Sequence, residues 1–318
     1  MARIAIIAIA ALALASCAAT PAPTTDDATV QIVASTNVYG SIATAIGGEH
    51  VTVTSLISSS AQDPHSYEAS AQDQLAVSKA DLVIENGGGY DPFIDTLLEA
   101  SSTDAVVVNA SEASGLLEGD HDHEGEEHAD EEHADEEEGH EGHDHIEGFN
   151  EHVWYSLHGM EHFAEHLAGE LSELDAANAA SYEQNLAAFV AEIEQLEATA
   201  ESLHELAEGQ SAAITEPVPL YLLEAAGFSN VTPAEFSEAI EEGTDVPPAA
   251  LRDTLAVIST VALLAYNSQT ASSETEQLRA AAEESGVPVV EFTETLPDGA
   301  DYVTWMTDNL EAIAAALR

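Results

Sequence analysis

Histidine and acidic residues gather in one stretch of the sequence, residues 120–145. The stretch holds seven of the fourteen histidines and fourteen of the sixty acidic residues of the chain. These histidines are His121, His123, His128, His133, His140, His143 and His145. Imidazole and carboxylate groups bind zinc and related divalent ions, and a histidine-rich tract is typical of metal binding. No apolar side chain here is larger than alanine, so we expect a flexible loop, either metal-binding or simply a solvated acidic spacer.

A second set of candidate ligands is scattered along the chain, at the ends of predicted elements. The set comprises His65, His152, Glu216 and Glu294. Three of them follow predicted strands, and His152 follows the acidic stretch. Ligands of α/β proteins bind outside the carboxyl ends of strands, where such side chains can converge on a cleft. Two imidazoles with two carboxylates can hold a divalent ion, the imidazoles favouring zinc and the carboxylates allowing manganese. Each residue taken alone also suits a purely structural role.

The first half of the chain alternates predicted strands and helices. Apolar runs rich in β-branched residues predict strands over residues 30–35, 51–57, 82–84 and 106–108. Helices are predicted over residues 39–46, 68–79 and 92–100. In the second of these helices, Leu75 and Val77 are expected on the inner side. Such alternation predicts a parallel, doubly wound sheet with helices on both faces.

Two helices are predicted after the acidic stretch, over residues 157–171 and 176–206. The second has one apolar face, and at 1.5 Å per residue it would be roughly 45 Å long, enough to run the length of two lobes. The alternation then resumes. Strands are predicted over residues 212–214, 261–265 and 287–290, and helices over residues 220–226, 247–257, 274–284 and 302–317. We therefore predict an α/β fold of two lobes.

The start of the chain resembles a bacterial lipoprotein signal. A short basic start is followed by an apolar run over residues 4–15 and by Leu14-Ala-Ser-Cys17. The run is too short for a membrane-spanning helix, and Cys17 is expected to carry the lipid. Cys17 is the only cysteine, so no intrachain disulfide is expected. We predict that the mature protein lies outside the cytoplasm, anchored to the cell membrane by lipid alone.

The net charge of the chain limits the classes of molecule that it can bind. The formal net charge is −55, with only five basic residues. Such a surface repels nucleic acid and anionic lipid headgroups and attracts cations, although acidic surfaces also serve solubility in salty surroundings. The sequence contains no Walker phosphate loop, nucleophile elbow or Cys-x-x-Cys motif, so we predict no enzymatic activity.

Short motifs along nearly the whole mature chain resemble one protein family. They include VASTNVYGSIA at residue 33, DPHSYE at residue 63, EHVW at residue 151, TEPVPLYLLEAAGF at residue 215 and FTETLP at residue 292. The chain resembles the metal-binding lipoproteins of zinc and manganese ABC importers, the cluster A-I or ZnuA/TroA-like substrate-binding proteins. The resemblance implies two α/β lobes, each a mainly parallel sheet with helices on both faces, bridged by one long helix, with the ion between the lobes.

The same resemblance implies a ligand set. His65 matches the first ligand, and His152 matches the second, although Glu151 stands where the family has proline. The third ligand is histidine in many zinc members and glutamate in many manganese members, and Glu216 matches the latter. Glu294 matches the fourth. The histidine-rich loop accompanies zinc members, so Zn²⁺ is the expected ion and Mn²⁺ the alternative.

We therefore expect a monomeric, high-affinity zinc-binding protein that delivers its ion to the permease and ATPase of an ABC importer. The predicted parts are a signal peptide (1–16), a tether (17–29), an N-terminal lobe (30–156) that contains the loop at 119–148, a helical segment (157–208) that includes the long helix, and a C-terminal lobe (209–318).

Two functions of other classes compete with this one. His162-Phe-Ala-Glu165-His166 matches the H-x-x-E-H pattern of some zinc metalloproteases, in which two histidines on one helix face bind zinc and the glutamate acts as base. In a chain rich in His and Glu, chance also explains this match. A surface metal buffer or adhesin without a transporter is the other alternative.

Overall fold

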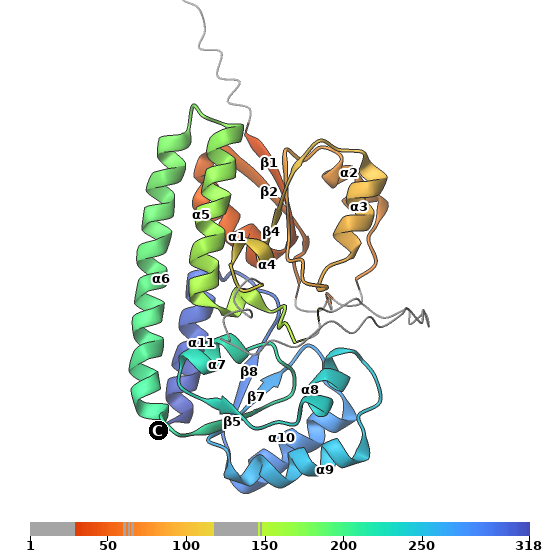
Figure 1. Cartoon of the computed structure of the whole chain (residues 1–318), viewed down its shortest axis with the longest axis vertical. Coiled ribbons are helices and arrows are strands. Elements are labelled where there is room, and N and C mark those ends of the chain that lie inside the picture. Colours follow the sequence, from red (N-terminus) through yellow and green to blue (C-terminus); the bar gives the residue numbers. More distant parts are fainter. Residues whose placement is uncertain (1–28, 60–61, 63, 65–66, 118–145, 147) are drawn as a thin grey trace, which may run out of the picture.

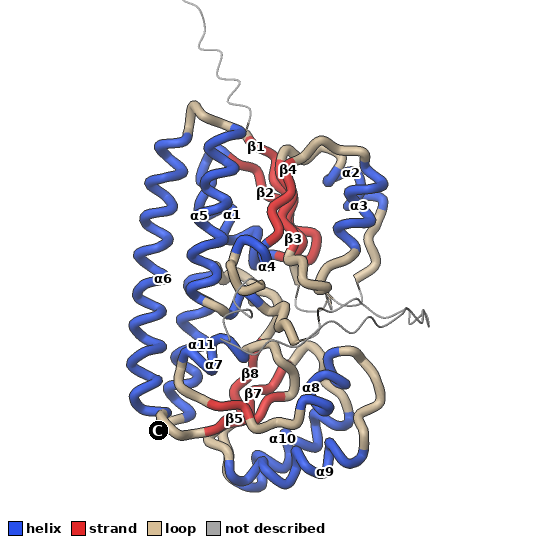
Figure 2. Tube along the Cα trace, in the orientation of Figure 1, coloured by secondary structure: helices blue, strands red, loops and turns tan. Residues whose placement is uncertain are grey.

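The chain folds into two lobes, each built on a parallel four-stranded sheet (Figures 1 and 2). The computed structural model describes residues 29–59, 62, 64, 67–117, 146 and 148–318. The N-terminal sheet has the order β2-β1-β3-β4. Its strands are β1 (Val30–Thr36), β2 (Val51–Ile57), β3 (Leu82–Glu85) and β4 (Val106–Asn109).

Helices cover both faces of the N-terminal sheet. Side chains alternate along a strand, so Ile32 of β1 packs on one face while its neighbour Val33 packs on the other. On the first face lie α1 (Asn37–Gly47) and α5 (Leu157–Leu174), and on the second lie α2 (Ala71–Val77) and α3 (Phe93–Ser101). The short helix α4 (Ala110–Ala113) follows β4.

The C-terminal sheet has the order β6-β5-β7-β8. Its strands are β5 (Ser211–Ile214), β6 (Ser229–Asn230), β7 (Leu263–Asn267) and β8 (Val289–Phe292). One face of this sheet packs against α7 (Leu220–Ala225) and α11 (Tyr302–Ala316). The other packs against α8 (Ala234–Glu241), α9 (Pro248–Val257) and α10 (Ser273–Ser285). Single 3-10 turns occur at Gly48–His50, Val153–Tyr155 and Ile258–Thr260.

One long helix, α6 (Ala179–Ala207), runs beside both lobes (Figure 1). Its 29 residues span about 43 Å at the helical rise of 1.5 Å. It packs against α1 and α5 of the N-terminal lobe and against α11 of the C-terminal lobe. As a result, a single cluster of buried apolar side chains extends without interruption through both lobes.

The predicted α/β fold with two lobes and a long helix is confirmed. The strands predicted over residues 261–265 and 287–290 begin and end two residues later in the structure. The inward placement of Leu75 is wrong, because this side chain is 54% exposed, whereas Val77 is buried as expected. The sequence reading left α4, α8 and β6 unassigned. Within the described residues, no helix combines the length and apolar character needed to cross a membrane.

Candidate metal centre

Two buried glutamates lie at the carboxyl edge of the C-terminal sheet. Glu216 follows β5 by two residues, and Glu294 follows β8 by two residues. Between these strands lies β7, whose last residue is Asn267. Because the carboxyl ends of neighbouring parallel strands meet at one edge, the three side chains converge there. Glu216 is 2% exposed and Glu294 is 1% exposed, so both carboxylates are removed from bulk water.

Asn267 connects these two carboxylates. Its Nδ2 donates to Oε2 of Glu216 and, at 2.8 Å, to Oε1 of Glu294. The Asn267 side chain is itself fixed, because its Oδ1 accepts from the Gln269 backbone N–H at 3.0 Å. Gln269 Oε1 in turn accepts from the backbone N–H of Glu294 at 2.6 Å. The amide group therefore sets the position and separation of the two acids.

Tyr90 of the N-terminal lobe contacts one of these carboxylates. Three consecutive glycines after β3, Gly87 to Gly89, all have positive φ, a conformation that glycine adopts without steric cost. This turn places Tyr90 so that its hydroxyl donates to Oε2 of Glu294 at 3.1 Å. The Tyr90 ring also lies 5.8 Å from the His152 ring, measured between centroids. Tyr90 therefore contacts both a carboxylate and an imidazole of the predicted ligand set.

His152 is fully buried beside the carboxylates. Its Nδ1 lies 2.8 Å from Oδ1 of Asn150. An amide oxygen accepts only, so this contact selects the tautomer with the proton on Nδ1 and the lone pair on Nε2. Asn150 also donates from Nδ2 to the carbonyl of Pro217 at 3.2 Å, next to Glu216. The segment that carries His152 is thereby joined to the loop that carries Glu216.

Two further carboxylates lie here that the sequence reading did not include. Glu151, His152 and Glu241 offer ligand atoms that lie within 4.8 Å of one another. Glu241 is the last residue of α8, and its Oε1 lies 3.6 Å from Nδ1 of His152. Its signal in the sequence is an amphipathic segment after Pro233, with Phe236 and Ile240 on the buried side.

The site is crowded with acidic groups, so that one of them holds its proton at neutral pH. Burial, together with the charges of Glu151, Glu216 and Glu294, raises the pKa of Glu241 to about 10. The described arginine ion pairs lie elsewhere, Arg252 with Asp253 and Arg279 with Glu283 and Glu291. Buried acids that repel one another in this way favour a bound cation.

The other predicted ligands and the predicted lipidation residue, Cys17, lie outside the described residues. These ligands are His65 and the histidines of the acidic loop, His121, His123, His128, His133, His140, His143 and His145. Of the scattered set, the structure therefore brings together His152, Glu216 and Glu294. The residues of the protease pattern lie instead on α5, where His162, Glu165 and His166 are all exposed.

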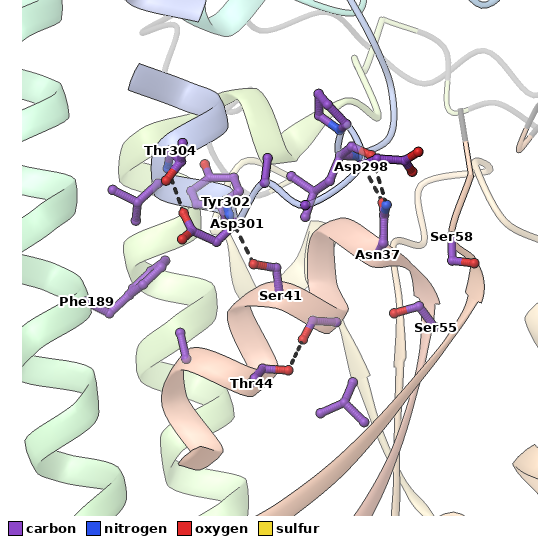
Figure 3. Close-up of a pocket in the computed structure, with 18 of the residues that line it drawn as sticks. Asn37, Ser41, Thr44, Ser55, Ser58, Phe189, Asp298, Asp301, Tyr302 and Thr304 are labelled. Carbon is purple, nitrogen blue, oxygen red and sulfur yellow. Dashed lines mark hydrogen bonds between the residues drawn. The ribbon is translucent and has the colours of Figure 1, made fainter. Parts of the chain in front are cut away.

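The loop that carries Glu294 is tied to the N-terminal lobe. Asn37 of α1 donates from Nδ2 to the carbonyl of Leu296 at 3.1 Å, and its Oδ1 accepts from the N–H of Leu296 at 2.9 Å. Asn37 and Leu296 both line a cavity of about 610 Å³, which the start of α11 also lines. Figure 3 shows Asn37 and Ser41 of α1 in this cavity, where Ser41 accepts from the N–H of Tyr302. The cavity is separate from the carboxylates, but its rim fixes the loop that positions one of them.

Comparison with known proteins identifies the family. Residues 32–316 match the family model described as zinc-uptake complex component A, periplasmic. The chain belongs to this family. It is therefore a metal-binding substrate-binding protein of an ABC importer, which implies a permease and an ATPase as partners.

Relatives of the family carry names that refer to different metals. The chain is 26% identical over 320 residues, 96% of its length and 94% of the relative, to the iron ABC transporter substrate-binding lipoprotein MtsA of Streptococcus pyogenes. It is 28% identical over 247 residues, 75% of its length and 72% of the relative, to the manganese-binding lipoprotein MntA of Halalkalibacterium halodurans. The fold matches the periplasmic zinc-binding protein TroA from Treponema pallidum with a TM-score of 0.70 at 19% identity, over 91% and 99% of the two chains.

We expect Asn267→Ala to weaken metal binding by about 10- to 100-fold, as loss of a group that orients metal ligands usually does. The metal-free protein should also lose about 1–3 kcal/mol of stability, because two buried carboxylates lose their common donor. Competition with a metal chelator and urea denaturation measure the two effects. The matched control is Asn230→Ala at the exposed end of β6. Unchanged affinity in Asn267→Ala would show that the amide does not organise the ligands.

The metal-free protein should lose stability as the pH rises above 5. Burial, followed by the charge of Asp91, raises the pKa of Glu85 from 4.5 to about 7, and burial raises that of Asp91 to about 6. Folded molecules therefore hold protons that unfolded molecules release. The stabilisation is complete below the unfolded pKa values and is lost as the pH rises through 6 to 7.

Glu85→Gln should remove part of this pH dependence, about 1–2 kcal/mol between pH 5 and pH 8 after allowance for its partial exposure. Urea denaturation of metal-free protein at the two pH values measures it. Glu99→Gln, at an exposed position of α3, is the control. Identical pH slopes in Glu85→Gln and the unmodified protein would contradict the assignment.

Proposed function

We propose that this protein captures Zn²⁺ outside the cytoplasm and delivers it to its ABC importer. The observation that carries the proposal is the fully buried imidazole of His152, held with its proton on Nδ1 next to two bridged carboxylates. Neutral imidazole is a favoured zinc ligand, and a partner on its other nitrogen is the usual way to fix its tautomer. His152, Glu216 and Glu294 are the proposed ligands in the described chain, with His65 proposed from the sequence as the fourth.

Mn²⁺ is the second candidate ion, and a specific observation favours it. Glu216, Glu294, Glu151 and Glu241 supply many hard oxygen donors around one imidazole. Carboxylate-rich sets suit manganese better than sets rich in imidazole do. The names of the two relatives above, which refer to iron and manganese, support a site of this kind.

We further propose that the protein works as a monomer held to the cell membrane by a lipid on Cys17, after removal of residues 1–16. The relatives MtsA and MntA are named as lipoproteins, which supports the anchor. Replacement of Cys17 by serine should release the protein into the soluble fraction and abolish labelling with a fatty-acid analogue. Membrane retention of an unlabelled Cys17→Ser variant would count against the anchor.

The histidine-rich stretch at residues 120–145 is proposed to collect zinc at low affinity for the buried site or to sense its abundance. Its composition supports either role. If the stretch collects zinc, deletion of these residues should slow zinc uptake when zinc is limiting. If it senses abundance, the deletion should instead change uptake when zinc is abundant. Unchanged uptake under both conditions would count against both roles.

Release of the ion is proposed to need movement of ligand loops or a modest tilt of the lobes. Ligands that come from loops of both lobes must separate before the ion can leave. The long helix α6 and the continuous apolar cluster oppose a wide opening.

The deciding experiment is titration of the mature protein from residue 18, with and without residues 120–145, with zinc and with manganese. Chelator buffers set the free metal concentration. One tight zinc equivalent that survives the deletion and is lost in His152→Ala would support the proposal. Tighter binding of manganese would favour the second candidate. If no tight equivalent remains after the deletion, the buried site of His152, Glu216 and Glu294 is not the main metal site.

A further inference from the structure

A second group of metal-binding side chains lies on the outer surface of α5, away from the buried carboxylates. His158, His162 and His166 recur every four residues, so they line one face of this helix. The opposite face is buried in the core through Phe163, Leu167 and other apolar side chains. The histidines therefore face solvent, and the side chain of His158 is 72% exposed.

Two of these imidazoles lie at the separation of ligands to one metal ion. Nε2 of His158 and Nε2 of His162 are 3.1 Å apart, and their rings are nearly perpendicular at an interplanar angle of 86°. Nitrogens bound to one tetrahedral zinc ion at about 2.0–2.1 Å lie about 3.3 Å from each other. The observed separation of the two Nε2 atoms is close to this distance. Both lone pairs could thus point at one ion with little movement.

Two carboxylates lie on the other side of the His158 ring. Nδ1 of His158 is 3.8 Å from Oε2 of Glu161 and 3.9 Å from Oε1 of Glu197, which belongs to α6. The donor atoms of these three residues lie within 4.8 Å of one another. At these separations the carboxylates make no hydrogen bond to Nδ1, but their negative charge favours the tautomer that carries the proton on Nδ1, which leaves the lone pair of Nε2 for a metal. The arrangement is that of a metal-binding histidine backed by acids.

The surrounding charge favours a cation. Helices α5 and α6 together carry ten glutamates and no lysine or arginine. Fields of one sign concentrate ions of the opposite sign at the surface. A hydrogen bond between two neutral imidazoles would also bring the nitrogens to 3.1 Å, but it needs neither the carboxylates nor the acidic surroundings.

We propose that His158 and His162 form a second, exposed site for a divalent ion that prefers imidazole, such as Zn²⁺, Ni²⁺ or Cu²⁺. The two Nε2 atoms bind the ion, and Glu161 and Glu197 orient His158. Mn²⁺ and Mg²⁺ prefer oxygen ligands and bind this site weakly. The site is independent of the function proposed above, because it shares no residue with the buried centre.

The test measures modification of each histidine by diethyl pyrocarbonate in the full mature protein, with chelator-buffered zinc and peptide mass spectrometry. Each peptide reports separately, so the acidic loop and His152 do not obscure the result. We expect zinc to protect His158 and His162 together, and Mg²⁺ to protect neither. His204, an exposed histidine of α6, should stay reactive and serves as the internal control.

Three variants make the test decisive. His162→Ala should abolish zinc protection of His158, and Glu197→Gln should raise the free zinc needed for half protection about tenfold. His204→Ala should change neither. The proposal is overturned if His158 remains as reactive as His204 at zinc concentrations that protect other histidines. It is also overturned if His162→Ala leaves protection of His158 intact, since the ion would then bind elsewhere or the pair would be only a hydrogen bond.

Discussion

Glu294→Gln should weaken zinc binding at the buried centre at least about 100-fold, or about 2.7 kcal/mol. The change keeps the size of the side chain and removes its charge and one acceptor oxygen. Loss of a group that only orients ligands already costs 10- to 100-fold on typical estimates, so loss of a ligand should cost at least the upper value, about 100-fold. Competition with a zinc chelator gives the affinity. Glu291→Gln, three residues earlier on β8 and with a 54% exposed side chain, is the matched control.

The same variant should have the opposite effect on the metal-free protein. Glu294 is buried near Glu216 and Glu241, and like charges in such a place repel. Removing one charge should therefore raise the melting temperature of the metal-free form. It should also reduce the further rise in melting temperature that zinc binding produces. A purely structural glutamate, held by Asn267 and Tyr90, would give lower stability in both forms. That result would contradict its assignment as a metal ligand.

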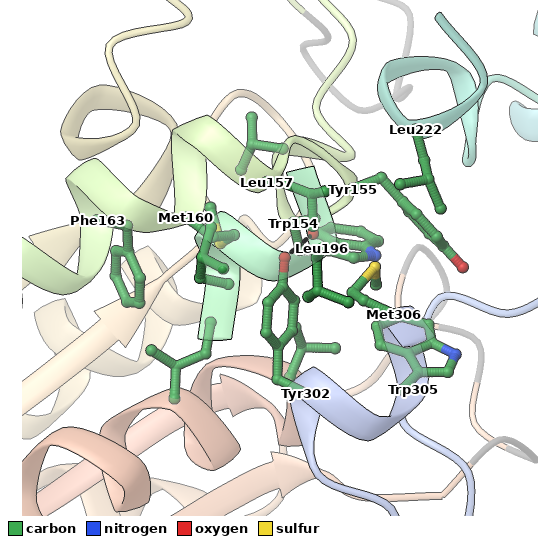
Figure 4. Close-up of a cluster of buried hydrophobic side chains, with 14 of the residues drawn as sticks. Trp154, Tyr155, Leu157, Met160, Phe163, Leu196, Leu222, Tyr302, Trp305 and Met306 are labelled. Carbon is green, nitrogen blue, oxygen red and sulfur yellow. Dashed lines mark hydrogen bonds between the residues drawn. The ribbon is translucent and has the colours of Figure 1, made fainter. Parts of the chain in front are cut away.

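Trp154→Ala should lower the free energy of unfolding by about 3–5 kcal/mol. Trp154 is fully buried where the two lobes meet, and its ring lies 4.8 Å from that of Tyr90 and 5.1 Å from that of His152. Its carbonyl accepts from the hydroxyl of Tyr302 at 2.7 Å. Figure 4 shows Trp154 among Tyr155, Met160, Tyr302 and Met306. The cavity left by the missing ring would open next to the predicted metal ligand.

Urea denaturation of the metal-free protein measures this loss. Leu206→Ala is the control, because Leu206 is 66% exposed and its truncation should change stability by less than about 0.5 kcal/mol. Zinc affinity should also fall in Trp154→Ala, since the ring packs against His152. A loss below 1 kcal/mol, close to that of the control, would mean that the surrounding side chains collapse into the space.

The strand-end rule explains which site residues the sequence could predict. Glu216 and Glu294 each follow a strand that is apolar enough to be recognised, and the carboxyl edge of a parallel sheet is where ligands bind. Asn267 was not predicted, because the strand that it ends was placed two residues too early and Asn267 was therefore assigned to a loop. A polar residue that ends a buried central strand is a signal that could have found it.

Glu241 was not predicted as a site residue for a different reason. Its helix, α8, is only eight residues long, and one turn of apolar spacing gives a weak pattern. Its position beside His152 depends on how α8 packs on the sheet, which local sequence does not specify. Leu75 shows the converse error, since it lies in an apolar run and yet faces solvent because α2 packs mainly through Val77.

The apolar cluster that passes through both lobes has a consequence for how the chain can be divided. Each sheet with its helices resembles an autonomous module, but α5 of one lobe and α11 of the other both bury apolar side chains against α6. Cutting the chain between the sheets would expose that shared surface on both pieces. The protein should therefore unfold in one cooperative transition. Exchange of a whole lobe would therefore require a matching change in the surface that the other lobe and α6 present to it.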